Sequence, residues 1–225
     1  GITDQTEIDL SDERLTPDQI AEKLNVTSRV DFIIERMNFY GHDGPKRKAL
    51  GFCITKKHAE FMAAEFNKRG IPSAYLTGED SEEERMRQIK LLESDTDKLN
   101  VIFTVDIFNE GIDIPEINQI VMLRPTQSPI VFVQQLGRGL RKAEGKEFVV
   151  IIDFIGNYNN NFMIPIALSG DRSYNKDTLR KYVVEGNRVI PGSSTIHFDE
   201  VTRKRIYESI DVSNFNDVRI IKESY

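Results

Sequence analysis

Short apolar segments alternate with amphipathic segments through the middle of the chain, and this alternation limits the possible fold more than any other feature. The apolar segments have no polar face, and the segments between them place apolar residues at helical spacing. Strands that are apolar on both faces and separated by helices are typical of a parallel sheet covered by helices, with right-handed crossovers. The expected strands are 49–54, 71–76, 101–105, 119–124 and 147–154. The expected helices between them are 55–70, 81–94, with Ser81 as its cap, and 128–141.

The residues before this region are acidic and contain two expected short helices. Thr16 is expected to cap the first, with Pro17 at its first position, and Ser28 with Asp31 is expected to open the second. The segment 41–48 contains two glycines and a proline, which favours a loop and a domain boundary. The expected division is a helical lead-in or linker at 1–45, a sheet domain at 46–156 and a C-terminal extension at 157–225.

The C-terminal extension changes in composition, beginning with an asparagine-rich polar segment. One helix is expected to start near Asn175, and a strand or loop followed by another helix is expected over 188–210. The extension is too short to bury much core of its own. We therefore expect it to pack on the sheet domain or to begin a further domain.

Composition excludes several classes of protein. The single Cys53 excludes an internal disulfide and a cysteine zinc site, and we expect no metal ligands here. No apolar run is long enough for a membrane span and no signal peptide is visible, so we expect a cytoplasmic protein. The net charge of -6 argues against nonspecific coating of nucleic acid. Basic residues gather at 46–48, 138–142 and 203–205, and each group is interpreted as a solvated face.

Residues that suit phosphate binding follow two of the expected strands. Ligands of open parallel sheets bind beyond the carboxyl ends of the strands. Thr55 and Lys56 follow the first strand, and Thr77 and Gly78 follow the second. Hydroxyl groups, lysines and main-chain amides at helix starts bind phosphate oxygens well. For Thr55 alone, an ordinary helix cap explains the residue equally well.

Two glycines interrupt the expected helix at 128–141, where each costs about 1 kcal/mol relative to alanine. They flank Arg138, and Arg141 lies three positions further on the same helical face. The segment matches neither a dinucleotide fingerprint nor a P-loop in spacing. Guanidinium groups stabilise the charge of a transferring phosphoryl group, so the pair fits arginine fingers. Ion pairs with surface carboxylates explain the same two residues equally well.

These motifs together resemble the second RecA-like motor domain of superfamily 2 helicases. The sequence LGFCITKKHAEFMAAEF is similar to the fourth helicase motif, VIFTVDIFNEGIDIP to the fifth and QQLGRGLR to the sixth. The whole chain further resembles large bacterial helicase-like proteins of DNA repair or restriction type. The resemblance implies an α/β fold: a RecA-like parallel sheet with helices on both faces, plus small helical N- and C-terminal extensions.

The resemblance also implies roles at the nucleotide. Arg138 and Arg141 would be arginine fingers that reach the γ-phosphate of ATP, and Gln134 would help to organise that face. Gly111 would approach the nucleotide, and Asp113 would bind near its ribose.

Five further residues are implied to contact the backbone of a nucleic acid, which we expect to be DNA. The family often has threonine immediately before the Asp106 position, where this chain has Val105. That difference weakens the assignment of the neighbouring threonine. The implied contacts are Thr55, Lys56, Thr77, Gly78 and Thr104.

The resemblance implies that part of the machinery lies elsewhere. ATP and Mg would be bound mainly by a first motor domain, with its P-loop, upstream in the same polypeptide. We therefore expect an ATP-dependent helicase in the full-length protein and no ATP hydrolysis by this chain alone. Two alternatives remain open: a non-catalytic module that binds nucleic acid or protein, and a duplex DNA translocase subunit of restriction type.

Overall fold

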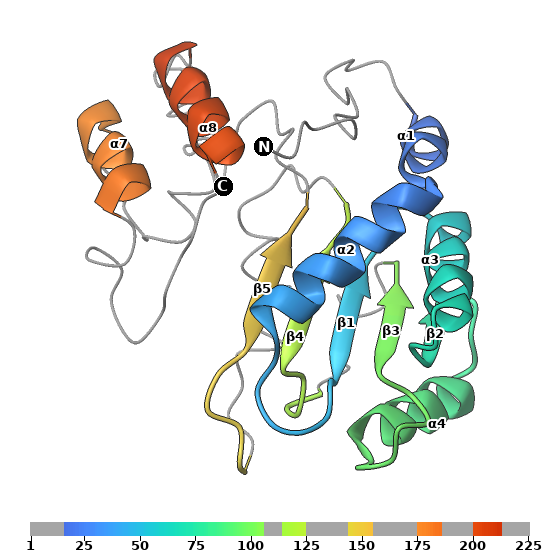
Figure 1. The fold of residues 1–225 in the computed structure, drawn as a ribbon. Helices are drawn as coiled ribbons and strands as arrows, with labels where there is room; N and C mark the ends of the chain where they lie inside the picture. Colours follow the sequence, from blue (N-terminus) through green and yellow to red (C-terminus); the bar gives the residue numbers. More distant parts are fainter. Residues whose placement is uncertain (1–15, 106–113, 125–143, 155–174, 186–199, 213–225) are drawn as a thin grey trace. The chain divides into compact units, whose positions relative to one another are not determined.

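The computed structural model describes two compact units of the chain (Figure 1). The first contains the sheet and the helices of the N-terminal half, including the helical lead-in. The second contains two helices of the C-terminal extension. The described residues are 16–105, 114–124, 144–154, 175–185 and 200–212.

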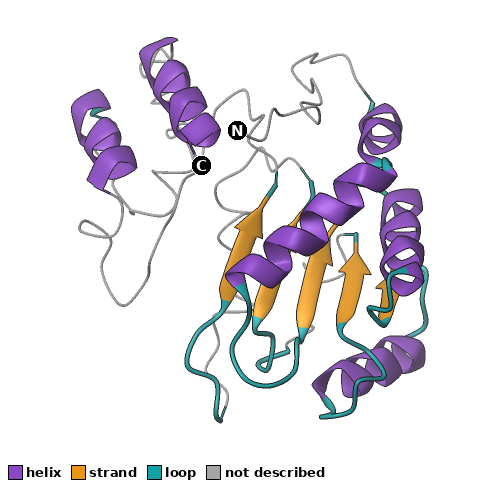
Figure 2. Cartoon of the chain, in the orientation of Figure 1, coloured by secondary structure: helices purple, strands orange, loops and turns teal. Residues whose placement is uncertain are grey.

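The first unit is built on a five-stranded parallel sheet with the strand order β2-β3-β1-β4-β5 (Figures 1 and 2). All five strands lie inside segments that the sequence predicts as strands, so the predicted parallel sheet is confirmed. The strands are β1 Ala49–Phe52, β2 Ser73–Leu76, β3 Val101–Thr104, β4 Gln119–Met122 and β5 Val150–Asp153.

The strands are paired in register, so they all end at one level. Phe52 at the end of β1 pairs with Thr104 of β3 and with Met122 of β4. Leu76 of β2 pairs with the same Thr104, and Met122 pairs with Asp153 of β5. The residues that follow the strands therefore lie along a single edge, which we call the carboxyl edge.

Among the described residues, four helices accompany the sheet, and three of them begin with a side-chain cap. The Thr16 hydroxyl accepts from Gln19 N at 3.3 Å, and Ser81 accepts from Glu84 N at 3.2 Å. The predicted start of the second helix at Ser28 is wrong, because this helix begins at Thr27 without a side-chain cap. The helices are α1 Pro17–Leu24, α2 Thr27–Tyr40, α3 Lys56–Lys68 and α4 Glu82–Glu93.

Helices α2 and α3 cover one face of the sheet and share a buried apolar cluster with it. Burial of this cluster is the main favourable contribution to the stability of the unit. The alternate strand residues, such as Leu50 and Ile120, point to the other face and are equally buried. The cluster includes Val30, Ile33 and Met37 of α2, Ala59, Met62 and Phe66 of α3, and Val101, Phe103 and Val121 of the sheet.

The glycine in the central strand makes room for an aromatic ring. Gly51 pairs with Phe103 of β3, and a Cβ atom added at Gly51 would come within 2.6 Å of the Phe103 ring. The ring is fully buried and packs edge-on against Phe66 of α3, with centroids 4.9 Å apart. Gly51 therefore lets the cluster under α3 close onto the sheet.

The second unit contains α7 (Lys176–Glu185) and α8 (Glu200–Val212), as the sequence predicts. Asn175 opens α7, since its side-chain oxygen accepts from Asp177 N at 2.8 Å. Arg180 of α7 pairs with Asp211 of α8. Within the parts of the chain that the structure describes, no helix combines the length and the apolar character that crossing a membrane requires.

Candidate nucleic-acid interface

Thr55 and Lys56 lie at the carboxyl edge, between β1 and α3. The Thr55 hydroxyl accepts from His58 N at 3.2 Å, so the capping role is confirmed. Lys56 is the first residue of α3, and its side chain is about half exposed. The main-chain amides at the start of α3 and the Lys56 ammonium are both suited to a phosphate group.

Thr77 and Gly78 form a tight turn at the same edge, after β2. Asp80 closes this turn, because one of its carboxylate oxygens accepts from Thr77 N at 2.6 Å and from the Thr77 hydroxyl at 3.1 Å. Arg85 of α4 donates to the Gly78 carbonyl at 2.8 Å. The turn is therefore held from both sides.

An ion pair joins the two strand ends. The Lys56 ammonium contacts the carboxylate of Glu79, which follows Gly78 in the turn after β2. This hydrogen bond raises the pKa of Lys56. The fold thus brings together Thr55, Lys56, Thr77 and Gly78, which are four of the five residues that the sequence predicts as backbone contacts.

Thr104, the fifth predicted contact, is placed differently. It ends β3 with 0% of its surface exposed, and its carbonyl accepts from Cys53 N at 2.8 Å. Its hydroxyl lacks a hydrogen-bond partner within the described structure. A direct contact between this side chain and a nucleic acid stays a prediction.

Two buried titratable groups lie beneath the edge. Cys53 is fully buried, and burial raises the pKa of its thiol. His58 is 1% exposed, and its Nδ1 lies 3.4 Å from Ile54 N. Burial lowers the pKa of His58 to about 4, and the nearby Arg29 charge acts in the same direction. The sequence interpretation overlooked His58, although its spacing of four from Met62 places it on the buried face of α3.

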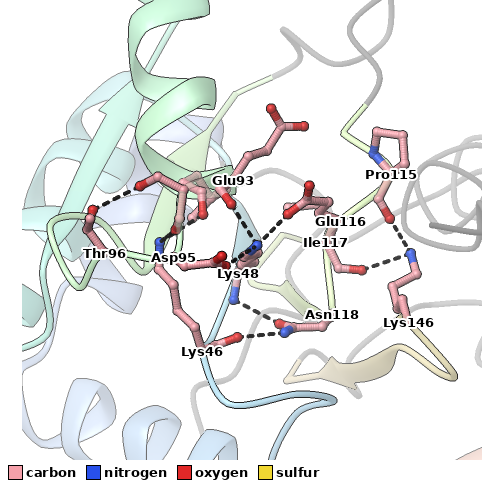
Figure 3. Close-up of polar contacts among 12 residues, drawn as sticks. Lys46, Lys48, Glu93, Asp95, Thr96, Pro115, Glu116, Ile117, Asn118 and Lys146 are labelled. Carbon is pink, nitrogen blue, oxygen red and sulfur yellow. Dashed lines mark hydrogen bonds and ion pairs between the residues drawn. The ribbon is translucent and has the colours of Figure 1, made fainter. Parts of the chain in front are cut away.

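At the opposite edge of the sheet, which we call the amino edge, lysines bind main-chain carbonyls (Figure 3). The Lys46 ammonium donates to the carbonyls of Leu91 and Leu92, at 3.3 and 2.9 Å, and to that of Ser94. Lys48 donates to the Glu93 carbonyl at 2.6 Å. These carbonyls belong to the end of α4, where helices leave acceptors unpaired and favour positive charge.

Side-chain contacts extend this arrangement across the amino edge (Figure 3). Lys48 also pairs with Glu116, and Asn118 donates to the Lys46 carbonyl at 2.7 Å. Lys146 donates to the carbonyls of Pro115 and Ile117. With 7% of its surface exposed, Lys46 contradicts the interpretation of residues 46–48 as a solvated face.

The residues predicted to act on ATP lie outside the described residues. The predicted fifth motif spans 101–115, and its residues 106–113 lie outside the described chain, which resumes at Ile114. After the predicted sixth motif the described chain resumes at Glu144. Among the residues whose positions are described, no three His, Cys, Asp or Glu side chains are grouped as metal ligands would be. The residues in question are Gln134, Arg138, Arg141, Gly111 and Asp113.

Curated relatives of the chain include proteins of several kinds. IRC3 of Saccharomyces cerevisiae, whose name assigns it provisionally to the ATP-dependent helicases, is 30% identical over 172 residues, covering 74% of this chain and 25% of IRC3. The UvrABC system protein B of Kosmotoga olearia is 30% identical over 53% of the chain and 18% of its own length. An endonuclease subunit of the Escherichia coli type I restriction enzyme EcoKI is 32% identical over 42% of the chain and 9% of its own length. The chain therefore spans a quarter or less of these relatives.

Solved structures show the same fold. The yeast DEAD-box splicing factor Prp28 superposes with a TM-score of 0.53 at 17% identity, covering 79% of this chain and 34% of Prp28. A fragment from Vibrio vulnificus, assigned provisionally as the HsdR subunit of a type I restriction enzyme, gives 0.51 at 21% identity, covering 67% of this chain and 31% of the fragment. Residues 28–143, just over half of the chain, match the helicase conserved C-terminal domain. The chain therefore belongs to the helicase C-terminal domain family and has its RecA-like fold.

Proposed function

We propose that the chain is the second motor domain of an ATP-dependent nucleic-acid helicase. One observation carries this proposal: in a member of the helicase C-terminal domain family, residues suited to phosphate gather where the loops after β1 and β2 meet at the carboxyl edge. Contacts of this kind hold a nucleic acid by its backbone and do not read its sequence. The residues are Thr55, Lys56 and Gly78, together with Thr77, whose N–H and hydroxyl are bound by Asp80 in the turn.

The nucleic acid that we propose is DNA. The EcoKI relative is, by its name, an endonuclease subunit of a type I restriction enzyme. The carboxyl edge itself offers groups that would accept either DNA or RNA, since phosphate contacts are common to both. A second form of the same motor activity, in keeping with the resemblance to restriction-type proteins and with the EcoKI relative, is translocation along duplex DNA without strand separation.

We propose that the ATPase site is completed by two domains of one polypeptide. A P-loop domain elsewhere in the polypeptide would hold ATP and Mg, and this chain would supply Arg138 and Arg141 to the phosphates. Gln134 would orient that face, while Gly111 and Asp113 would lie against the nucleotide. A guanidinium held near the γ-phosphate neutralises charge that develops during phosphoryl transfer.

DNA-stimulated ATP hydrolysis by the full-length polypeptide tests this proposal. Arg138→Ala is expected to lower turnover by about 100-fold or more while ATP binding persists. The matched control is Arg87→Ala, which removes an exposed arginine that pairs with Glu84 on α4. Unchanged turnover in Arg138→Ala, or turnover that never depends on DNA, would instead support a non-catalytic binding module.

A further inference from the structure

Two carboxylates of the turn after β2 bind hydrogen-bond donors that are expected to bind phosphate. Glu79 contacts the Lys56 ammonium, and Asp80 accepts from both the main-chain N–H and the hydroxyl of Thr77. A carboxylate and a phosphate diester both present anionic oxygens to such donors. The turn therefore places the protein's own anions where the backbone of a nucleic acid would bind.

The two carboxylates differ in how readily a phosphate could replace them. Asp80 accepts from the main chain, and its own N–H donates to the Thr77 carbonyl at 3.2 Å, so it is part of the turn. The Glu79 side chain contacts Lys56 at the surface, with 76% of the Glu79 side chain and 49% of the Lys56 side chain exposed. Exposed ion pairs contribute little to stability, so a phosphate can displace Glu79 at small cost.

The turn also fixes where the Glu79 side chain begins. Glu79 N donates to the Thr77 hydroxyl at 3.3 Å, which ties the residue to the closed turn beside α3. The main chain of Glu79 is thus held in place, and its carboxylate contacts Lys56, which lies 23 positions earlier in the sequence. Because of this arrangement, the Glu79 carboxylate lies within ion-pairing reach of Lys56 in the protein without nucleic acid.

We propose that Glu79 is a built-in competitor of the nucleic-acid backbone at Lys56, and that it sets the affinity of the carboxyl edge for DNA. The inference rests on the proposed function, because it assumes that Lys56 contacts the DNA backbone. In the DNA-free protein the Glu79 carboxylate neutralises Lys56. On binding, a phosphate takes the ammonium and the Glu79 side chain turns to solvent.

Binding of a fluorescein-labelled single-stranded DNA of mixed sequence to the full-length polypeptide, followed by anisotropy at low salt, tests the competition. Glu79→Gln is expected to bind up to about fivefold more tightly than the natural protein. The matched control is Glu82→Gln, which removes the same charge from an exposed position in the first turn of α4. The difference between the two variants measures the local competition at Lys56, apart from the change in net charge.

The same pair of variants is then compared in a Lys56→Gln background. If Glu79 competes for Lys56, Lys56→Gln weakens binding and the difference between Glu79→Gln and Glu82→Gln disappears. Weakened binding in Lys56→Gln with equal effects of the two glutamate variants overturns the competition and leaves the DNA contact intact. Unchanged binding in Lys56→Gln overturns both the contact and the competition. Urea unfolding of each variant establishes that all of them are folded.

Discussion

The two edges of the sheet both carry lysines, but these lysines have different partners. At the amino edge, Lys46 is almost fully buried and donates to main-chain carbonyls at the end of α4. At the carboxyl edge, Lys56 is half exposed and pairs with the Glu79 side chain. A main-chain carbonyl cannot turn away from its donor, whereas a side-chain carboxylate can. The type of hydrogen-bond acceptor therefore distinguishes Lys46, which stabilises the fold, from Lys56, which is available to a ligand.

The largest effect is expected at the amino edge. Lys46→Met should lower the free energy of unfolding by about 3 kcal/mol, because it leaves acceptors at the buried end of α4 without a donor. Urea denaturation measures this change. Lys57→Met, which removes an exposed lysine from the first turn of α3, is the matched control and should change stability by no more than about 0.5 kcal/mol. Equal effects of the two variants would remove the distinction between the edges.

A smaller effect, dependent on pH, is expected beneath the carboxyl edge. His58 stays neutral in the folded protein because its pKa is lowered to about 4, whereas in the unfolded chain it takes up a proton below about pH 6.5. Stability should therefore fall by about 2 kcal/mol as the pH drops from 7 to 5. Urea denaturation at several pH values measures the loss, and His58→Gln should remove it. A loss of the same size in His58→Gln would assign the dependence to other groups.

The smallest effect on stability is expected for Lys56 itself. Lys56→Met removes only a surface ion pair, so the free energy of unfolding should change by less than about 0.5 kcal/mol. Thermal or urea unfolding of this variant beside Lys46→Met gives the contrast directly. A loss of several kcal/mol in Lys56→Met would mean that this lysine also holds the fold.

Local sequence predicted most of the elements of the sheet unit. Ser81 caps α4 as predicted, and Thr55 caps α3, which was one of the two roles left open for it, because a cap depends on residues within three positions. The start of α2 was predicted one residue late, since packing of Val30 and Ile33 against the sheet decides it and no cap does. The partners of Lys46 were not predictable, because they lie about 45 positions away and only the folded sheet brings them close.

The candidate site was predictable to a similar degree. The rule that ligands bind beyond strand ends selected Lys56 and Thr77, and the fold places both at the carboxyl edge. The role of Glu79 was hidden, because in sequence it belongs to an acidic run that continues to Glu84. Only the pairing of both β1 and β2 with β3 brings Glu79 to Lys56.

The strand order also constrains how the chain folds as it is synthesised. The central strand β1 pairs with β3 and β4, whose residues follow about 50 and 70 positions later, and β5 completes the sheet only after Asp153. Contacts so distant in sequence form slowly, since a long loop must close first. Until β4 leaves the ribosome, β1 lacks a hydrogen-bonded neighbour on one side, and its apolar residues remain exposed there. The nascent chain is therefore most prone to aggregation in this interval, and chaperones that bind exposed strands would act then.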